Sequence, residues 1–152
     1  MNTTDLSSKR FSVDDDLDAM YDYATEQGWG DGLPIIPPTE ARVRRMLAPL
    51  GRRPDEVVAI LTPRNAPATI EKVAVNAVMA GCKPEYLPAV IAAVEAMADP
   101  AFNLYALSTS TNSATPCVII NGPARLALKV NCGYSCFGSG TRANATIGRE
   151  QL

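Results

Sequence analysis

The stretch ATIEKVAVNAVMAGCKPEYLPAVIAAVEAMA, residues 68–98, predicts two consecutive apolar helices at the centre of the fold. In its first half, apolar residues recur at the three- and four-residue spacing that lines one face of a helix. Gly81 ends this helix, and Pro84 stands at a favoured first position of the next one, which runs to Asp99. The apolar positions of the second helix are Tyr86, Leu87, Val90, Ile91, Val94 and Met97.

The residues before this pair predict two more helices and one strand. A helix follows an N-cap at Ser12 and ends at Gly28, and another runs from Thr39 to Gly51. Between them, GWGDGLPIIPP (28–38) predicts an ordered, irregular loop, because glycine and proline interrupt regular structure. The β-branched run EVVAIL (56–61) predicts a buried strand, and a proline-containing loop follows it.

The residues after the pair predict two more strands, near 104–109 and 116–121, then a short helix after Asn121. The glycine-rich residues 131–142 form a loop, and a last helix starts near Ala143. This order predicts an α/β or α+β fold in which a small mixed sheet is covered by helices.

The two ends of the chain carry separate expectations. Residues 1–11 are polar and predict a disordered lead-in, which leaves residues 12–152 as a single α/β-type domain. The last helix has an apolar stripe that reaches only from Ile147 to Leu152, and short isolated helices are marginally stable. We therefore expect a fold that is incomplete at the C-terminus, or completed by a second chain; an ordinary C-terminal helix end is the alternative.

Composition excludes several classes of protein. The formal net charge is −2, and the arginines of residues 42–53 lack interleaved aromatic residues, which argues against nucleic-acid binding. No apolar run has the length of a membrane span, and the N-terminus lacks a signal peptide, so we expect a cytoplasmic protein with reduced thiols. The absence of histidine removes serine–histidine and cysteine–histidine catalysis and imidazole zinc sites.

The glycine-rich run NCGYSCFGSGTRANATIGR (131–149) is the first candidate site. A loop that leads into a helix N-terminus offers backbone N–H groups to an anion, and arginines add bidentate contacts. The run matches neither the P-loop nor the dinucleotide-binding fingerprint, and a plain connector is the alternative. The candidate ligands of a small anion here are Ser139, Thr141, Arg142, Asn144 and Arg149.

Cysteines and a polar rim give two further candidates. Cys132 and Cys136 form a possible redox pair, although inert thiols are the simpler interpretation and no metal site is expected. Arg64 follows the first predicted strand, where α/β proteins build sites, and is a further candidate anion ligand. Asp31 also belongs to this rim, as does Asn76, for which a satisfied core amide is the alternative.

Three segments together resemble a poorly characterised bacterial family associated with UGSC-type (seleno)proteins. They are Trp29–Pro34 (WGDGLP), Val75–Cys82 (VNAVMAGC) and Arg142–Arg149 (RANATIGR). The resemblance covers about residues 28–152 and implies a chain longer than this one. It supplies no catalytic residue, and Thr141 stands where the family pattern implies asparagine.

Two functions remain open at this point. The first is an enzyme or enzyme subunit that binds a small anionic substrate or cofactor of unknown identity at the glycine-rich loop, with thiol redox chemistry at Cys132 or Cys136 as its sharper form. The second is a non-catalytic binding or assembly subunit that docks on another protein chain or on its own copy. A gene fragment without independent function is the third possibility.

Overall fold

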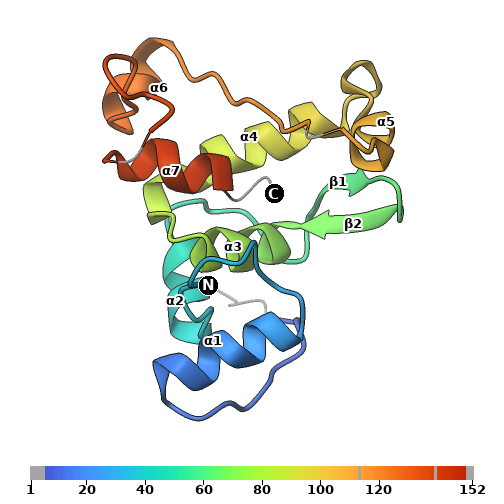
Figure 1. Ribbon diagram of the computed structural model, residues 1–152, viewed down its shortest axis with the longest axis vertical. Coiled ribbons are helices and arrows are strands. Elements are labelled where there is room, and N and C mark those ends of the chain that lie inside the picture. Colours follow the sequence, from blue (N-terminus) through green and yellow to red (C-terminus); the bar gives the residue numbers. More distant parts are fainter. Residues whose placement is uncertain (1–5, 113, 139, 150–152) are drawn as a thin grey trace.

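A computed structural model describes residues 6–112, 114–138 and 140–149 of the chain. In it, α3 (Ile70–Met79) lies in the middle of the molecule, with α4 and α7 on one side and α1 on the other (Figure 1). Ile70, Ala74 and Ala77 of α3 have no exposed surface. Thr69 caps the helix by accepting a hydrogen bond from the Lys72 amide. The predicted central helix pair is therefore confirmed.

The second helix of the pair begins with the 3₁₀ turn η1 (Pro84–Tyr86) and continues as α4 (Leu87–Ala98). Leu87 and Val90 are fully buried against the α3 side of the core. Helix α2 (Glu40–Leu47) packs against α3 with its buried Val43 and Met46. The predicted helix at 39–50 is thus found, three residues shorter at its end.

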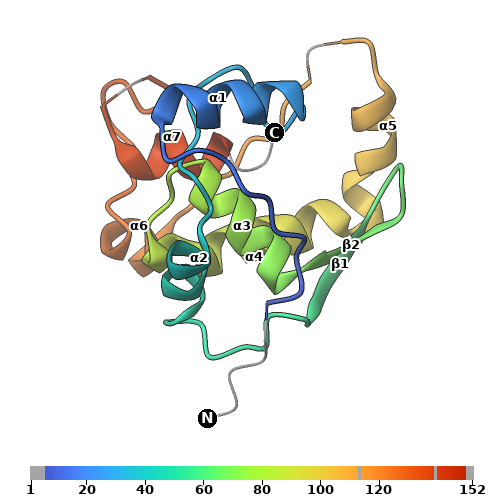
Figure 2. The same cartoon turned by 90° about the horizontal axis from the view of Figure 1, so that it is seen from below.

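The sheet is a single antiparallel hairpin of β1 (Val57–Leu61) and β2 (Ala66–Thr69). The strand predicted at 56–61 is found at 57–61, but its residues are half-buried or exposed rather than buried. Its partner lies in and beyond the predicted loop. Ile60 is the register partner of Pro67, a residue that cannot donate to a ladder and is tolerated at the edge of a sheet. The hairpin lies at one end of the molecule, beside α4 (Figures 1 and 2).

The strands predicted at 104–109 and 116–121 are wrong. Residues Leu104–Thr109 form helix α5, which follows the 3₁₀ turn η2 (Pro100–Phe102). Asn103 adopts a left-handed conformation (φ 56°) and caps α5 through its side chain, a local signal that overrides the β-type composition. Residues 116–121 run outside any sheet to α6 (Gly122–Ala127). Helix α7 (Arg142–Arg149) begins one residue before the predicted start.

The described residues therefore form an α+β fold, as the sequence predicts, but their sheet is a two-stranded antiparallel hairpin rather than a mixed sheet. No single helix among the described residues has the length and apolar character to cross a membrane. One pair, Pro84–Ala98 with Pro100–Thr109, reaches that length only together and is bent by 71°.

The N-terminal segment lies on the domain. Helix α1 (Leu17–Glu26) is capped by Asp16, four residues after the predicted cap at Ser12. Upstream, Phe11 makes an edge-on contact with Trp29, with ring centroids 5.0 Å apart. These contacts differ from the expected disordered lead-in over residues 1–11, of which 1–5 lie outside the described residues.

Glu71 anchors the same segment from within α3. Its side chain is 2% exposed, and its carboxylate accepts hydrogen bonds from the Ser7 amide and hydroxyl and from the Ser8 amide, at 2.9–3.0 Å. Burial acts to raise the pKa of Glu71, but the hydrogen bonds from Ser7 and Ser8 outweigh it and hold the pKa below its ordinary value. The carboxylate is therefore buried in its charged form.

We expect Glu71→Gln to lower the free energy of unfolding by about 1–3 kcal/mol, because an amide NH₂ cannot accept from the serine amides. A depressed carboxyl pKa stabilises the fold above the unfolded-state pKa, and this contribution is lost as pH falls through the folded-state pKa. Wild-type stability should therefore fall more steeply in acid than that of the variant. Urea titrations at several pH values measure both effects, with the exposed Glu26→Gln as control. Equal stability of the two variants at neutral pH would contradict a stabilising role for the contacts of Glu71 with Ser7 and Ser8.

Candidate functional site

The three segments that carry the resemblance meet at one place in the structure. Ile36, at the end of the 28–36 loop, donates its amide to the Met79 carbonyl of α3 (3.1 Å). Arg142, the first residue of α7, donates Nε–H to the Gly81 carbonyl just beyond α3 (2.9 Å). Gly81 has φ +86°, a conformation that strains other residues, and it lies against Thr146 of α7. The end of α3 thus holds both the loop and α7.

Arg149 closes this arrangement from the other end of α7. Its guanidinium makes a bidentate ion pair with Asp31, with both N–O distances 2.7 Å. It also donates to the carbonyls of Leu33 (3.0 Å) and Pro34 (3.1 Å). The side chains of the ion pair keep part of their surface in contact with water, 19% for Arg149 and 22% for Asp31. Arg149 therefore fixes the loop to α7, and its guanidinium makes four hydrogen bonds within the chain.

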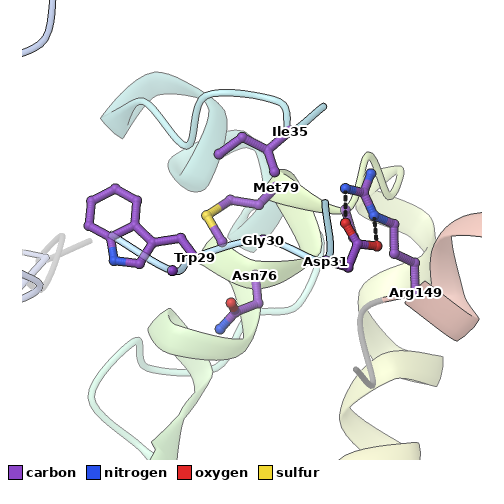
Figure 3. Close-up of a pocket in the computed structure, with 9 residues that line it drawn as sticks. Trp29, Gly30, Asp31, Ile35, Asn76, Met79 and Arg149 are labelled. Atoms are coloured by element: carbon purple, nitrogen blue, oxygen red, sulfur yellow. Dashed lines mark hydrogen bonds and ion pairs between the residues drawn. The ribbon is translucent and has the colours of Figure 1, made fainter. Parts of the chain in front are cut away.

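A pocket of about 260 Å³ lies beside this ion pair (Figure 3). Trp29 and Ile35 from the loop and Asn76 and Met79 from α3 form its walls, and the Asp31–Arg149 pair lies at one side. Asn76 is exposed and donates its amide to the Lys72 carbonyl one turn earlier, so it is not a core amide. The pocket is smaller than most ligand sites.

The ion pair also fixes the charge at the pocket. Hydrogen bonds from Arg149 lower the pKa of Asp31 to about 2. A carboxyl group with such a pKa stays ionised at neutral pH and is a weak base. Because the guanidinium is matched to this carboxylate, an anion would have to displace Asp31 to bind Arg149. The pair is thus suited to holding the loop rather than to acid–base chemistry.

Asn144 joins the glycine-rich loop to α7. Its side chain accepts from the Asn131 amide (2.8 Å) and donates to the carbonyls of Asn131 and Cys136 (both 2.9 Å). The amide group pairs with the backbone as a neighbouring strand would. The side chain of Asn144 therefore bonds to the backbone of the loop, whereas the sequence predicts that it contacts an anion.

The remaining candidates do not form one cluster. Thr141 accepts the first hydrogen bond of α7 through its carbonyl, and Arg142 is exposed at the same helix start. Arg64 lies in the turn of the hairpin, at the opposite end of the molecule from α7 (Figures 1 and 2). Ser139 lies outside the described residues. Thr141, Arg142, Asn144 and Arg149 thus lie in or directly before α7 but contact different neighbours, whereas Arg64 lies apart.

The thiols of the chain differ in their surroundings. Cys132 is exposed and Cys136 half-buried, in a turn closed by the hydrogen bond from the Cys136 amide to the Gly133 carbonyl (3.3 Å). Cys82 is buried and donates to the Thr146 carbonyl (3.4 Å). Within the described residues, no three acidic, cysteine or histidine side chains are placed to hold a metal ion.

Sequence reasoning missed the positions that make the pocket and the loop. Trp29 and Met79 carry no chemical signal for a pocket wall, and Asn131 becomes a partner of Asn144 only through the fold. Among protein-family models, curated proteins and solved structures, none matches this chain. The resemblance to the UGSC-associated family therefore remains a hypothesis.

We expect Arg149→Lys to lower the free energy of unfolding by about 1–3 kcal/mol, because lysine keeps the charge but not the two-pronged contact. The Asp31–Arg149 contribution should also disappear as pH falls toward 2, since a depressed carboxyl pKa stabilises only above that value. Chemical denaturation of Arg149→Lys, Asp31→Asn and the double variant measures the coupling. The exposed Arg45→Lys is the control. Fully additive effects of the two single variants would show that Asp31 and Arg149 do not stabilise the fold as a pair.

We expect Asn144→Asp to loosen the 131–138 turn, because a carboxylate would face the Asn131 and Cys136 carbonyls without a proton to donate. The half-buried Cys136 should then react faster with a thiol reagent, while the exposed Cys132 changes little. The rates follow from labelling and peptide mass spectrometry. The matched control is Asn112→Asp, whose side chain is exposed, and unchanged Cys136 reactivity would rule out the role given to Asn144.

Proposed function

We propose that this chain is a non-catalytic assembly subunit that docks on another protein chain through its C-terminal half. The supporting observation is the exposure of large apolar side chains after α4, in a part of the chain that adds little to the core. Tyr134 is 100% exposed, Phe137 93%, Ile119 82% and Leu126 67%. Exposed apolar groups that lie together on the surface are typical of interaction sites. We call residues 102–137 the apolar arm.

The core explains why the apolar arm is left uncovered. The buried cluster is built from α2, β2, α3, η1, α4 and α7, together with the loop residue Cys82. The arm contributes only half-buried side chains: Val118, Ile120, Leu128 and Val130. Tyrosine and phenylalanine are enriched at protein interfaces, where they bury large areas. Docking of another chain would remove these side chains from water.

The contacts that the predicted anion ligands make within the chain also favour the assembly function over anion binding. Arg149 is paired with Asp31, Asn144 is bound to the loop backbone, and Arg64 lies at the far end of the molecule. A small anion would meet only Arg142 and the start of α7. The free thiols fit a reducing compartment, so we place the assembly in the cytoplasm, with a UGSC-type protein as one possible partner.

A second candidate function is binding of a small anionic substrate or cofactor at Arg142, with thiol chemistry at Cys132 or Cys136. The observation in its favour is that Arg142 is exposed at a helix start close to Tyr86, where its positive charge opposes the rise that burial causes in the Tyr86 pKa. Under this alternative, Cys132→Ser or Cys136→Ser would abolish turnover and leave ligand binding intact.

One comparison separates the two functions. We expect the natively purified protein to sediment above the single-chain mass of 16.2 kDa, with Tyr134 and Phe137 protected from carbene footprinting in the assembled fraction only. Phosphate and small carboxylates should leave the melting temperature unchanged. A monomer that labels fully at both aromatic residues, and that gains an anion-dependent rise in melting temperature lost in Arg142→Ala, would instead establish the second function.

A further inference from the structure

The connection between α5 and α6 contains a segment with the character of a strand. Residues 115–120 (TPCVII) are rich in β-branched side chains, which favour strands. Their exposure alternates: Val118 and Ile120 pack against the core, while Cys117 and Ile119 face outward. Figure 1 shows the segment running at the outer side of the molecule between the two helices. Alternation with a period of two is the geometry of a half-buried strand.

This segment has no strand beside it in the described part of the chain. None of the backbone N–H and C=O groups of residues 115–120 makes a hydrogen bond to another described residue. Proteins usually protect such an open edge with charged side chains, inward-pointing charges or proline. Pro116 protects only the first position, and the exposed position in the middle is the large apolar Ile119.

We propose that residues 116–120 pair, in antiparallel orientation, with the same residues of a second copy of this chain. This inference rests on the proposed assembly function and names its partner. Antiparallel pairing about a two-fold axis makes an edge complementary to itself, because each strand offers the same donors and acceptors to the other. The two copies would then share a small sheet, with each core packed against the inner face of its own strand.

The charge distribution selects a second copy over a charged partner. The run from Pro100 to Ala124 contains no charged residue, although the chain has 14 basic and 16 acidic residues elsewhere. The two copies of any residue near a two-fold axis lie close together, so a charge there would lie near a like charge. An uncharged run avoids this repulsion, and it gives an oppositely charged partner nothing to recognise.

The outward face supports the same pairing. In an antiparallel pair, residues opposite each other point to the same side of the sheet. With Val118 at the two-fold axis, Cys117 of one copy would therefore lie opposite Ile119 of the other, and the four side chains would shield each other from water. No other exposed apolar side chain is needed for this contact, so the rest of the apolar arm is free to enlarge the interface.

The test uses the purified full chain, sedimentation velocity over a range of concentrations, and amide hydrogen exchange. We expect a dimer in which alternate amides of residues 117–120 are protected, because only every second residue of an antiparallel strand bonds its partner, and protection that is lost on dilution. Ile119→Lys should raise the dimer dissociation constant at least about tenfold, because the two lysines would be diagonal neighbours on one face, close to the axis. Cys117→Lys should act in the same direction. Leu17→Lys, an equally exposed change at the start of α1, should leave the dimer intact.

Circular dichroism and thermal melting confirm that each variant is folded, as the exposure of Cys117 and Ile119 leads us to expect. A dimer that survives both Ile119→Lys and Cys117→Lys would overturn the pairing. A monomer whose 117–120 amides become protected only when another purified chain binds would overturn the second copy as partner but keep the assembly function. Protection of these amides already in the monomer would overturn both the pairing and the assembly function. The backbone groups of this edge would then form their hydrogen bonds within the chain.

Discussion

Burial of α3 is the constraint on which the rest of the structure depends. A helix with apolar residues on several faces must be covered by other elements, and α2, α4, the hairpin and α7 supply that cover. Its end at Gly81 then receives two further contacts, from Ile36 of the 28–36 loop and from Arg142 of α7. These contacts cover α3, whereas several large side chains of the apolar arm, residues 102–137, stay exposed.

The Asp31–Arg149 pair shows how two distant segments become one unit. The ion pair joins residues 118 positions apart, and the two carbonyl contacts of Arg149 bind the loop at Leu33 and Pro34. An arginine near a glycine-rich loop suggests anion binding from sequence, yet here the anion is a carboxylate of the same chain. The chemistry that the sequence indicates is present, but it is used to hold the fold together.

Local signals made much of the helical structure predictable. The spacing of apolar residues located α3 and α4, and Pro84 marked the start of the second helix of the pair. Strand pairing and side-chain partners were less predictable, because they depend on residues that are far apart in the sequence. Pro67 led to the prediction of a loop where β2 lies. The cap at Asn103 starts α5 in a segment that was predicted to be a strand. Residues 116–120 have the alternation of the predicted strand without a neighbour, and nothing local in the sequence predicts whether a strand finds a partner. The same holds for Glu71, whose partners Ser7 and Ser8 lie over sixty residues away.

The central claim is that the open edge of residues 116–120 is completed by another copy of the chain. An isotope-filtered nuclear Overhauser experiment on a mixture of labelled and unlabelled protein tests it most directly. The account predicts contacts between amide protons of residues 117–119 in the labelled copy and α-protons of the same segment in the unlabelled copy, since the strands of an antiparallel pair lie about 5 Å apart. Contacts confined to a single copy, at concentrations where the protein is assembled, would contradict it.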